Sequence, residues 1–280
     1  MLIGLLMLGG VAAGAFGSLL GLGGGLLIVP LLTFGFGLPL REAVGVSLIC
    51  VIMTSSAAAG VYLERHVANL RLGMALELFT AIGALIGASI AFLLDERLLS
   101  LLFGGLLLYV AVTMARAREV EPTLISDDDE SVDSSGLAPS TPVLTTLDRL
   151  SGPGYRVRNL GRGIVGSTGA GVVSALLGIG GGIIKVPVMH LSMGVPLRVA
   201  TATSNMMIGI TASASAIIYL IRGGIDPYVA GPTAIGVFLG ATAGSRLAHR
   251  VNLRYLRILF VVVLVWTGIQ MLLRALQVGS

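Results

Sequence analysis

Charged side chains are scarce in this sequence of 280 residues. Asp, Glu, Lys and Arg together make up 11% of the residues, whereas about a quarter is usual for a soluble domain. Hydrophobic residues make up 55%, the mean hydropathy is +0.96, and most charges lie between long apolar runs. This scarcity excludes an ordinary soluble domain and predicts a polytopic membrane protein.

Other absences narrow the function. A single cysteine, Cys50, excludes a disulfide framework. No basic cluster is interleaved with aromatic residues, so we expect no nucleic-acid partner. The apolar segments hold one deep carboxylate, Glu77, and no Cys/His cluster, which argues against a metal site. The sequence contains no ATP-binding motif, and we predict no cofactor.

What the chain does contain is eight apolar segments. The unbroken ones are about 18 to 23 residues long, enough to cross a hydrocarbon core as helices, and none alternates like a strand of a membrane barrel. Residues 1–20 resemble a signal peptide in their apolar core and small residues. The same segment recurs in mid-chain at 160–178, so we interpret residues 1–20 as part of the fold. The predicted fold is all-α, with segments at 2–36, 42–63, 72–94, 98–115, 160–194, 199–221, 229–248 and 255–275.

The chain also contains an internal duplication with an offset of 157 residues. Gly14–Leu63 aligns with Gly171–Leu220 without a gap, and 21 of 50 positions are identical. In each copy a glycine-rich stretch, 21–25 or 178–182, interrupts the first apolar segment. Such helix-breaking elements at corresponding places in two halves are the best sequence indication of a transporter's binding site.

The duplication divides the chain into three parts. We predict a first membrane repeat at 1–116 and a second at 159–280, each with a glycine-broken first segment and three transmembrane helices. Residues 117–158 are polar and include the acidic run Asp127–Glu130. Because this stretch cannot bury enough apolar surface to order itself, we predict a flexible acidic linker.

Arginine positions indicate how the repeats are oriented. If each broken segment crosses the membrane once, ten arginines lie on the face of the linker and seven on the other. If each broken segment is a re-entrant hairpin, the counts become 13 and 4. Since positive residues concentrate in cytoplasmic loops, we expect inverted repeats in the cell (inner) membrane, with a cytoplasmic linker.

The glycines themselves are candidate ligands. Glycine destabilises a helix by about 1 kcal/mol relative to alanine, and backbone groups freed inside a membrane must find protein or water partners. We therefore predict that the breaks line an anion pocket, with tight helix packing as the alternative. Prolines follow each break and support it. The candidate residues are Gly23, Gly24, Gly25, Gly180, Gly181 and Gly182, with Pro30 and Pro187 as support.

Small polar residues follow each break on the second segment of each half. Hydroxyl and amide groups are neutral donors that can hold an oxyanion. Each can also form a hydrogen bond with its own helix or with a neighbouring helix. We predict substrate contacts from Ser47, Thr203, Ser204 and Asn205, with Asn205 the most polar.

Ionisable residues inside apolar segments are informative because they are rare. Lys185 follows the second break and aligns with Ile28, so it could attract an anion, snorkel to an interface or pair with a carboxylate. Glu77 could couple transport to protons or make an interface contact. His190 is a second proton-coupling candidate, because histidine is the residue type that most readily changes charge at physiological pH; the alternative is a packing residue.

These motifs resemble the TauE/SafE family of sulfite and organosulfonate exporters. The resemblance extends over roughly 1–116 and 160–278. It rests on two copies of Gly-x-Gly-Gly-Gly, each followed by a proline five residues after the last glycine and then by Gly-x-Pro-x-Arg-x-Ala. It implies a membrane permease for small sulfur-containing anions. The family's helix start falls on Ala202–Asn205, whereas the first copy reads Gly45–Leu48, so we expect two chemically unequal half-sites.

We therefore predict a secondary transporter that exports sulfite, sulfoacetate or another organosulfonate by alternating access, and not an enzyme. The alternatives are an anion channel and a permease of the same fold with a different small-anion cargo. A dyad of Ser167 and His190 lacks a third group and a supporting spacing. The expected partners are a small anionic substrate and the lipid bilayer, and a homodimer is one oligomeric state that the sequence allows.

Overall fold

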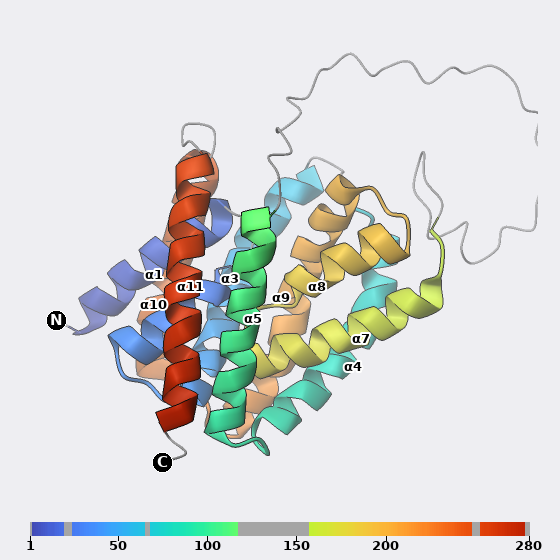
Figure 1. The fold of residues 1–280 in the computed structure, drawn as a ribbon. Coiled ribbons are helices and arrows are strands. Elements are labelled where there is room, and N and C mark those ends of the chain that lie inside the picture. Colours follow the sequence, from blue (N-terminus) through green and yellow to red (C-terminus); the bar gives the residue numbers. More distant parts are fainter. Residues whose placement is uncertain (1, 20–23, 65–67, 117–156, 248–252, 278–280) are drawn as a thin grey trace, which may run out of the picture.

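The computed structural model describes residues 2–19, 24–64, 68–116, 157–247 and 253–277. All regular elements in these ranges are helices (Figure 1). The first half contains α1 (Leu2–Leu19), α2 (Gly25–Pro30), the π-helix η1 (Leu31–Gly35), α3 (Leu40–Glu64), α4 (Leu70–Ala91) and α5 (Glu96–Arg116). The second contains α7 (Leu160–Leu177), α8 (Gly182–Pro187), the π-helix η2 (Val188–Ser192), α9 (Leu197–Ile221), α10 (Pro227–Leu247) and α11 (Leu253–Gln277).

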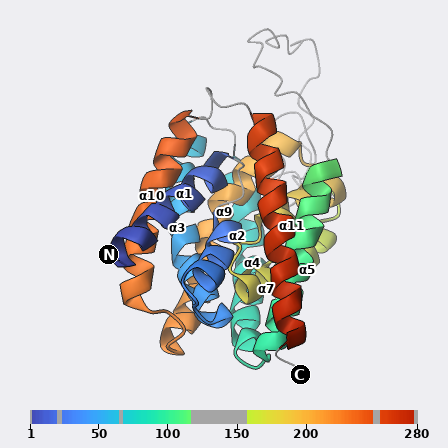
Figure 2. The same ribbon diagram turned by 60° about the vertical axis from the view of Figure 1, so that its left-hand side comes forward.

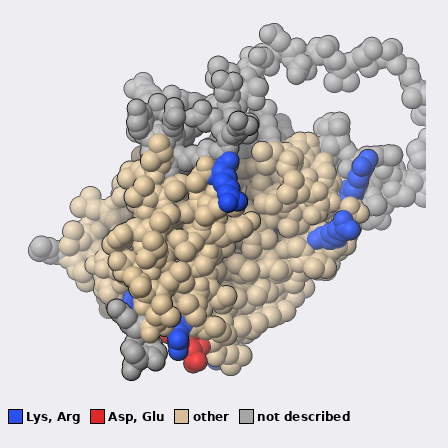
Figure 3. Space-filling view, in the orientation of Figure 1, with Lys and Arg blue, Asp and Glu red and all other residues tan. Residues whose placement is uncertain are grey.

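Six of the described helices are long and apolar enough to cross a membrane: α3, α4, α5, α7, α9 and α11. The prediction of an all-α polytopic membrane protein is confirmed. Charged residues lie toward the margins of the face in Figure 3, with a broad uncharged band between them. Such a band is what a lipid-facing surface requires. The predicted linker falls outside the described residues except for Val157 and Arg158, so the proposed repeat boundaries remain predictions.

The two halves repeat the same order of elements, and their breaks share a backbone conformation. Gly24 and Gly181, which are 157 residues apart, both have φ of 73°. Gly37 and Gly194, at the same offset, have φ of 69° and 71°. A side chain is strained at such angles, which accounts for glycine at these positions. The repeat in sequence is therefore also a repeat in local structure.

The halves are interlocked through their first helices. α1 packs along α10 of the second half, and α7 packs along α4 of the first (Figure 2). Glycines allow the close approach, because a Cβ at Gly83 would collide with the Thr168 carbonyl and one at Gly240 with that of Val11. These two contacts are equivalent under the 157-residue offset. Further collisions of this kind would occur at Gly14, Gly87, Gly171, Gly236 and Gly244.

Equivalent helices also contact each other directly. α5 lies beside α11 (Figures 1 and 2), and α3 packs on α9. At the start of α3, Gly45 lies against the carbonyl of Gly224, which follows α9. Beyond the other end of α3, the Asn69 N–H donates to Thr203 Oγ1 at 2.9 Å, near the start of α9. α3 and α9 are therefore antiparallel.

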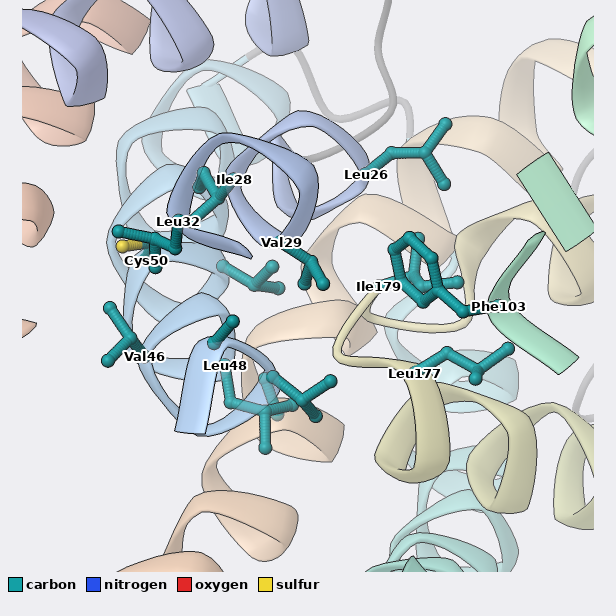
Figure 4. Packing of buried hydrophobic residues seen from close by; sticks show 14 of the residues in the cluster. Leu26, Ile28, Val29, Leu32, Val46, Leu48, Cys50, Phe103, Leu177 and Ile179 are labelled. Carbon is teal, nitrogen blue, oxygen red and sulfur yellow. The ribbon is translucent and has the colours of Figure 1, made fainter. Parts of the chain in front are cut away.

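The main apolar core lies where the two breaks meet these central helices. Leu26, Ile28 and Val29 of α2 are buried around α3, and Ile179 of the second break lies next to Phe103 of α5 (Figure 4). Residues from both halves thus form one core, which fixes the breaks in the middle of the protein.

Candidate substrate site

Ser47 joins the two glycine breaks. Its Oγ lies 3.2 Å from the Gly25 carbonyl oxygen and 2.8 Å from the Gly178 carbonyl oxygen, so one buried hydroxyl is shared between both halves. Gly25 has no room for a side chain, because a Cβ would lie 2.5 Å from the Gly178 oxygen. The breaks predicted from sequence are therefore in direct contact.

Two buried hydroxyls flank the second break without a partner among the described residues. Ser174 and Ser204 are fully buried, and neither Oγ makes a hydrogen bond. Ser174 Cβ lies 3.2 Å from where a Cβ of Gly181 would be, and Ser204 Oγ lies 3.6 Å from that of Gly182. A buried polar group without a partner is unfavourable by about 1–3 kcal/mol. These hydroxyls are thus available to a ligand.

The cavity beside this break is small. Ser174, Gly181 and Ile184 line a space of about 10 Å³, which is at the lower limit for one water molecule. An anion with several heavy atoms requires more room. The surrounding helices must therefore separate before such an anion can reach Ser174 through this cavity.

Lys185 is buried just after the second break, in a polar cluster with Glu77 and Thr211. Its Nζ donates to Glu77 Oε2 at 3.0 Å and to Thr211 Oγ1 at 2.7 Å, and Thr211 Oγ1 also lies 2.6 Å from Glu77 Oε1. Lys185 is 1% exposed and Glu77 is 4% exposed. Of the three interpretations of Lys185 from the sequence, the structure shows pairing with a carboxylate.

This polar cluster has no counterpart in the first half. At the 157-residue offset, Lys185 corresponds to Ile28 and Glu77 to Ala234, and both of these apolar residues are buried. Thr211 corresponds to Thr54, whose Oγ1 donates to the Val51 carbonyl of its own helix. The surroundings of the two breaks are thus chemically unequal.

Thr203, the backbone of Asn205 and His190 make hydrogen bonds within the protein. Thr203 Oγ1 accepts from the Asn69 N–H, and the Asn205 carbonyl accepts from Ser55 Oγ at 2.7 Å. His190 Nδ1 lies 2.9 Å from the Val195 carbonyl oxygen, and its side chain is exposed. The structure therefore places Thr203 and Asn205 at the contact of α9 with the first half, and His190 away from the buried cluster.

The remaining predicted residues belong to the backbone of the breaks. Gly23 lies outside the described residues. Gly180 and Gly181 have φ of 80° and 73°, and Gly182 begins α8. Pro30 and Pro187 end α2 and α8, and each is followed by five π-helical residues. A proline removes one backbone donor, and π-helical turns are frequent at functional sites.

Three residues of this region make or flank contacts that the local sequence pattern does not predict. Thr211 belongs to a Ser/Thr run, but its part in the Lys185 cluster depends on contacts between distant segments. Ser174 precedes the glycines by one helical turn, and this spacing is the sequence feature that indicates its position beside the break. Ser55 Oγ accepts from the Gly209 N–H at 3.0 Å and so joins α3 to α9 at two points.

Comparison with known proteins agrees with this architecture. The family model described as "Sulfite exporter TauE/SafE" matches residues 6–271. The chain is 25% identical over 270 residues to the probable membrane transporter protein YunE of Bacillus subtilis, covering 94% of each chain. It is 26% identical to a probable membrane transporter protein of Methanocaldococcus jannaschii, covering 98% of this chain and 96% of that protein.

A shorter match extends the comparison to plants. Over 98 residues, or 35% of this chain and 23% of the relative, it is 33% identical to sulfite exporter TauE/SafE family protein 6 of Arabidopsis thaliana. No solved structure matches the chain significantly. The family model covers nearly the whole chain, both breaks included, and the resemblance read from the glycine motifs is confirmed. The protein is a membrane transporter that belongs to the TauE/SafE sulfite exporter family.

Proposed function

We propose that this protein is a secondary transporter that exports small sulfur-containing anions such as sulfite, sulfoacetate or another organosulfonate. The family supports an anion cargo through its description as sulfite exporters. The observation that carries the proposal is the buried Lys185, which places a positive charge beside the second break. A buried ionisable group within a membrane protein marks a substrate or ion pathway.

The proposed ligands are concentrated in the second half. Ser174 and Ser204 supply neutral hydroxyls beside Gly181 and Gly182, and Lys185 supplies an ammonium group that is paired with Glu77. Ser47 and the first break complete the pocket from the opposite side. In this arrangement the first half is mainly scaffold, while the second selects the anion.

The contacts around the breaks support alternating access. Because α3 and α9 are antiparallel and equivalent by sequence, we propose that the repeats are inverted in the membrane, with the linker in the cytoplasm. The small cavity beside Ser174 favours an occluded state that must open toward one face at a time. Rocking of one repeat against the other is a general mechanism for such transporters.

The Lys185–Glu77 pair bears on the driving force. With Glu77 ionised, the pair is neutral and the anion alone carries charge, so an inside-negative potential drives it outward by about 2.3 kcal/mol per charge per 100 mV. If Glu77 instead takes up a proton, Lys185 is released and a monovalent anion moves together with that proton. We propose the first mechanism, and electrical measurements distinguish the two because only the first generates a current.

Flux measurements in proteoliposomes test the function directly. Labelled sulfite, sulfoacetate and taurine are loaded separately, and efflux is followed with and without an imposed potential. We expect efflux of at least one, accelerated when the interior is negative. If folded protein moves none of them, the assigned cargo is wrong. Single-channel currents far above transporter turnover would instead establish the channel alternative.

A further inference from the structure

A polar cavity lies at the ends of four helices, away from Lys185. It has a volume of about 260 Å³ and is lined by the start of α3, the end of α4, the start of α5 and the end of α9. A larger cavity of about 540 Å³ between α1, η1 and α11 has an almost wholly apolar lining and does not suit an anion. The smaller cavity is lined by Arg41 and Arg222 together with Phe92, Glu42 and Glu96.

Two arginines from opposite halves share one aromatic ring in this cavity. The guanidinium carbons of Arg41 and Arg222 lie 5.3 and 5.7 Å from the centroid of Phe92. Arg41 Nη2 donates to the Leu94 carbonyl at 2.8 Å, whereas its Nε is buried without a hydrogen-bond partner. Among the described residues neither arginine forms an ion pair. Two like charges thus lie against one aromatic ring without a counter-charge in contact.

The two carboxylates in the lining have other roles. Glu96 Oε1 accepts from the Leu40 N–H at 3.0 Å and so caps the start of α3. Glu42 lies in the first turn of α3, where a negative charge is favoured by the helix dipole. Neither carboxylate lies within ion-pair distance of an arginine in the described structure. Both guanidinium groups therefore remain available to an external anion.

We propose that this cavity is a second binding site for a small oxyanion of the sulfonate or sulfite type. Guanidinium groups match the oxygen atoms of such pyramidal or tetrahedral anions through paired N–H donors. At about 30 Å³ per water molecule, the volume accommodates an anion of this size with part of its hydration shell. Phe92 packs against both guanidinium groups and so helps to position them.

The position of the cavity indicates its role. Glu96 begins α5 and Arg116 ends it, so the cavity lies at the face opposite the one where the linker begins. Phe92 also contacts Tyr219 at 5.0 Å between ring centroids, and the Tyr219 hydroxyl donates to the Ala175 carbonyl, three residues before the second break. The cavity therefore adjoins the break through one aromatic side chain. This role as a vestibule for the transported anion rests on the proposed function.

Equilibrium binding tests the site independently of transport. Purified full-length protein in detergent is titrated with methanesulfonate at low ionic strength. We expect Arg222→Gln, whose side chain is exposed, to weaken binding at least about tenfold, as for a lost charged hydrogen bond. Arg41→Gln should have a similar effect if it folds. The matched control is Arg97→Gln, an exposed arginine in the first turn of α5 that does not line the cavity.

Transport then tests the role of the cavity. In proteoliposomes, Arg222→Gln should raise KM at least about tenfold for anion presented to the cavity side and leave KM for the other side unchanged. Superimposable binding curves for wild type, Arg222→Gln and Arg97→Gln would overturn the site. If the wild type transports none of the anions but binding still depends on Arg222, the proposed function fails while the site stands.

Discussion

Lys185 and Glu77 come from opposite halves of the chain, and a buried ion pair of 3.0 Å between Nζ and Oε2 joins them. The pair links α8, directly after the second break, to α4. Any movement of the second break relative to α4 must therefore stretch or break this contact. This relationship makes the pair the point at which stability and transport can be separated by mutation.

Removal of one charge should destabilise the protein. Glu77→Gln leaves Lys185 buried without its counter-ion, and loss of one partner of a buried pair is unfavourable by about 3–5 kcal/mol. We expect a markedly lower Tm in detergent by thermal unfolding. Glu42→Gln, which removes a carboxylate that makes no ion pair with the described residues, is the control and should shift Tm little. Equal Tm values for the two variants would show that the pair is not formed.

Replacement of both charges should restore stability without restoring transport. The double variant Lys185→Ile and Glu77→Ala installs the residues of the other half, Ile28 and Ala234, at the equivalent positions. Replacing a buried pair by apolar residues is often neutral or stabilising. We expect a Tm near that of the wild type, together with loss of anion efflux. Efflux at the wild-type rate would assign the pair a purely structural role.

Glycines at the helix contacts should not tolerate a methyl group. Gly83→Ala places a Cβ against the Thr168 carbonyl where α4 meets α7, and such overpacking is unfavourable by about 1–3 kcal/mol. Gly169→Ala on α7 is the matched control, because open space surrounds its position, and alanine favours a helix by up to about 1 kcal/mol. The free energy of unfolding, measured by chemical unfolding in detergent, should therefore be highest for Gly169→Ala, intermediate for the wild type and lowest for Gly83→Ala. The reverse order would contradict the close contact.

The hydroxyl shared between the breaks should matter more than a neighbouring hydroxyl of the same helix. Ser47→Ala removes the donor to the Gly25 and Gly178 carbonyls, and unsatisfied buried acceptors are unfavourable by about 1–3 kcal/mol. We expect a lower Tm and slower efflux. Ser56→Ala is the control, since the exposed Ser56 bonds to the Ile52 carbonyl of its own helix. If both variants behave alike, Ser47 does not hold the breaks together.

Much of the fold was predictable because it depends on local pattern. Apolar length located the helices to within a few residues, and the glycine triplets located both breaks. Gly24 and Gly181, at equivalent places in the repeat, also share a φ of 73°. These features are determined by neighbouring residues and by the membrane's demand for satisfied backbone groups.

The partners across the structure were not predictable from local pattern. Lys185 and Glu77 are 108 residues apart, and no spacing rule connects two residues on different helices. The packing of α1 on α10 had a signal, however. Gly10 and Gly14 are four residues apart, as are Gly236, Gly240 and Gly244, which is the small-residue spacing of closely packed membrane helices.

Interlocking of the two halves has a consequence for biosynthesis. α1 is made well before its main packing partner, α10, which begins more than 200 residues later at Pro227. The glycine-lined surface of α1 therefore stays in the membrane without its packing partner until α10 has been inserted. Neither half is a complete folding unit, so a chain truncated after the linker would expose the close-contact surfaces of both α1 and α4 to lipid.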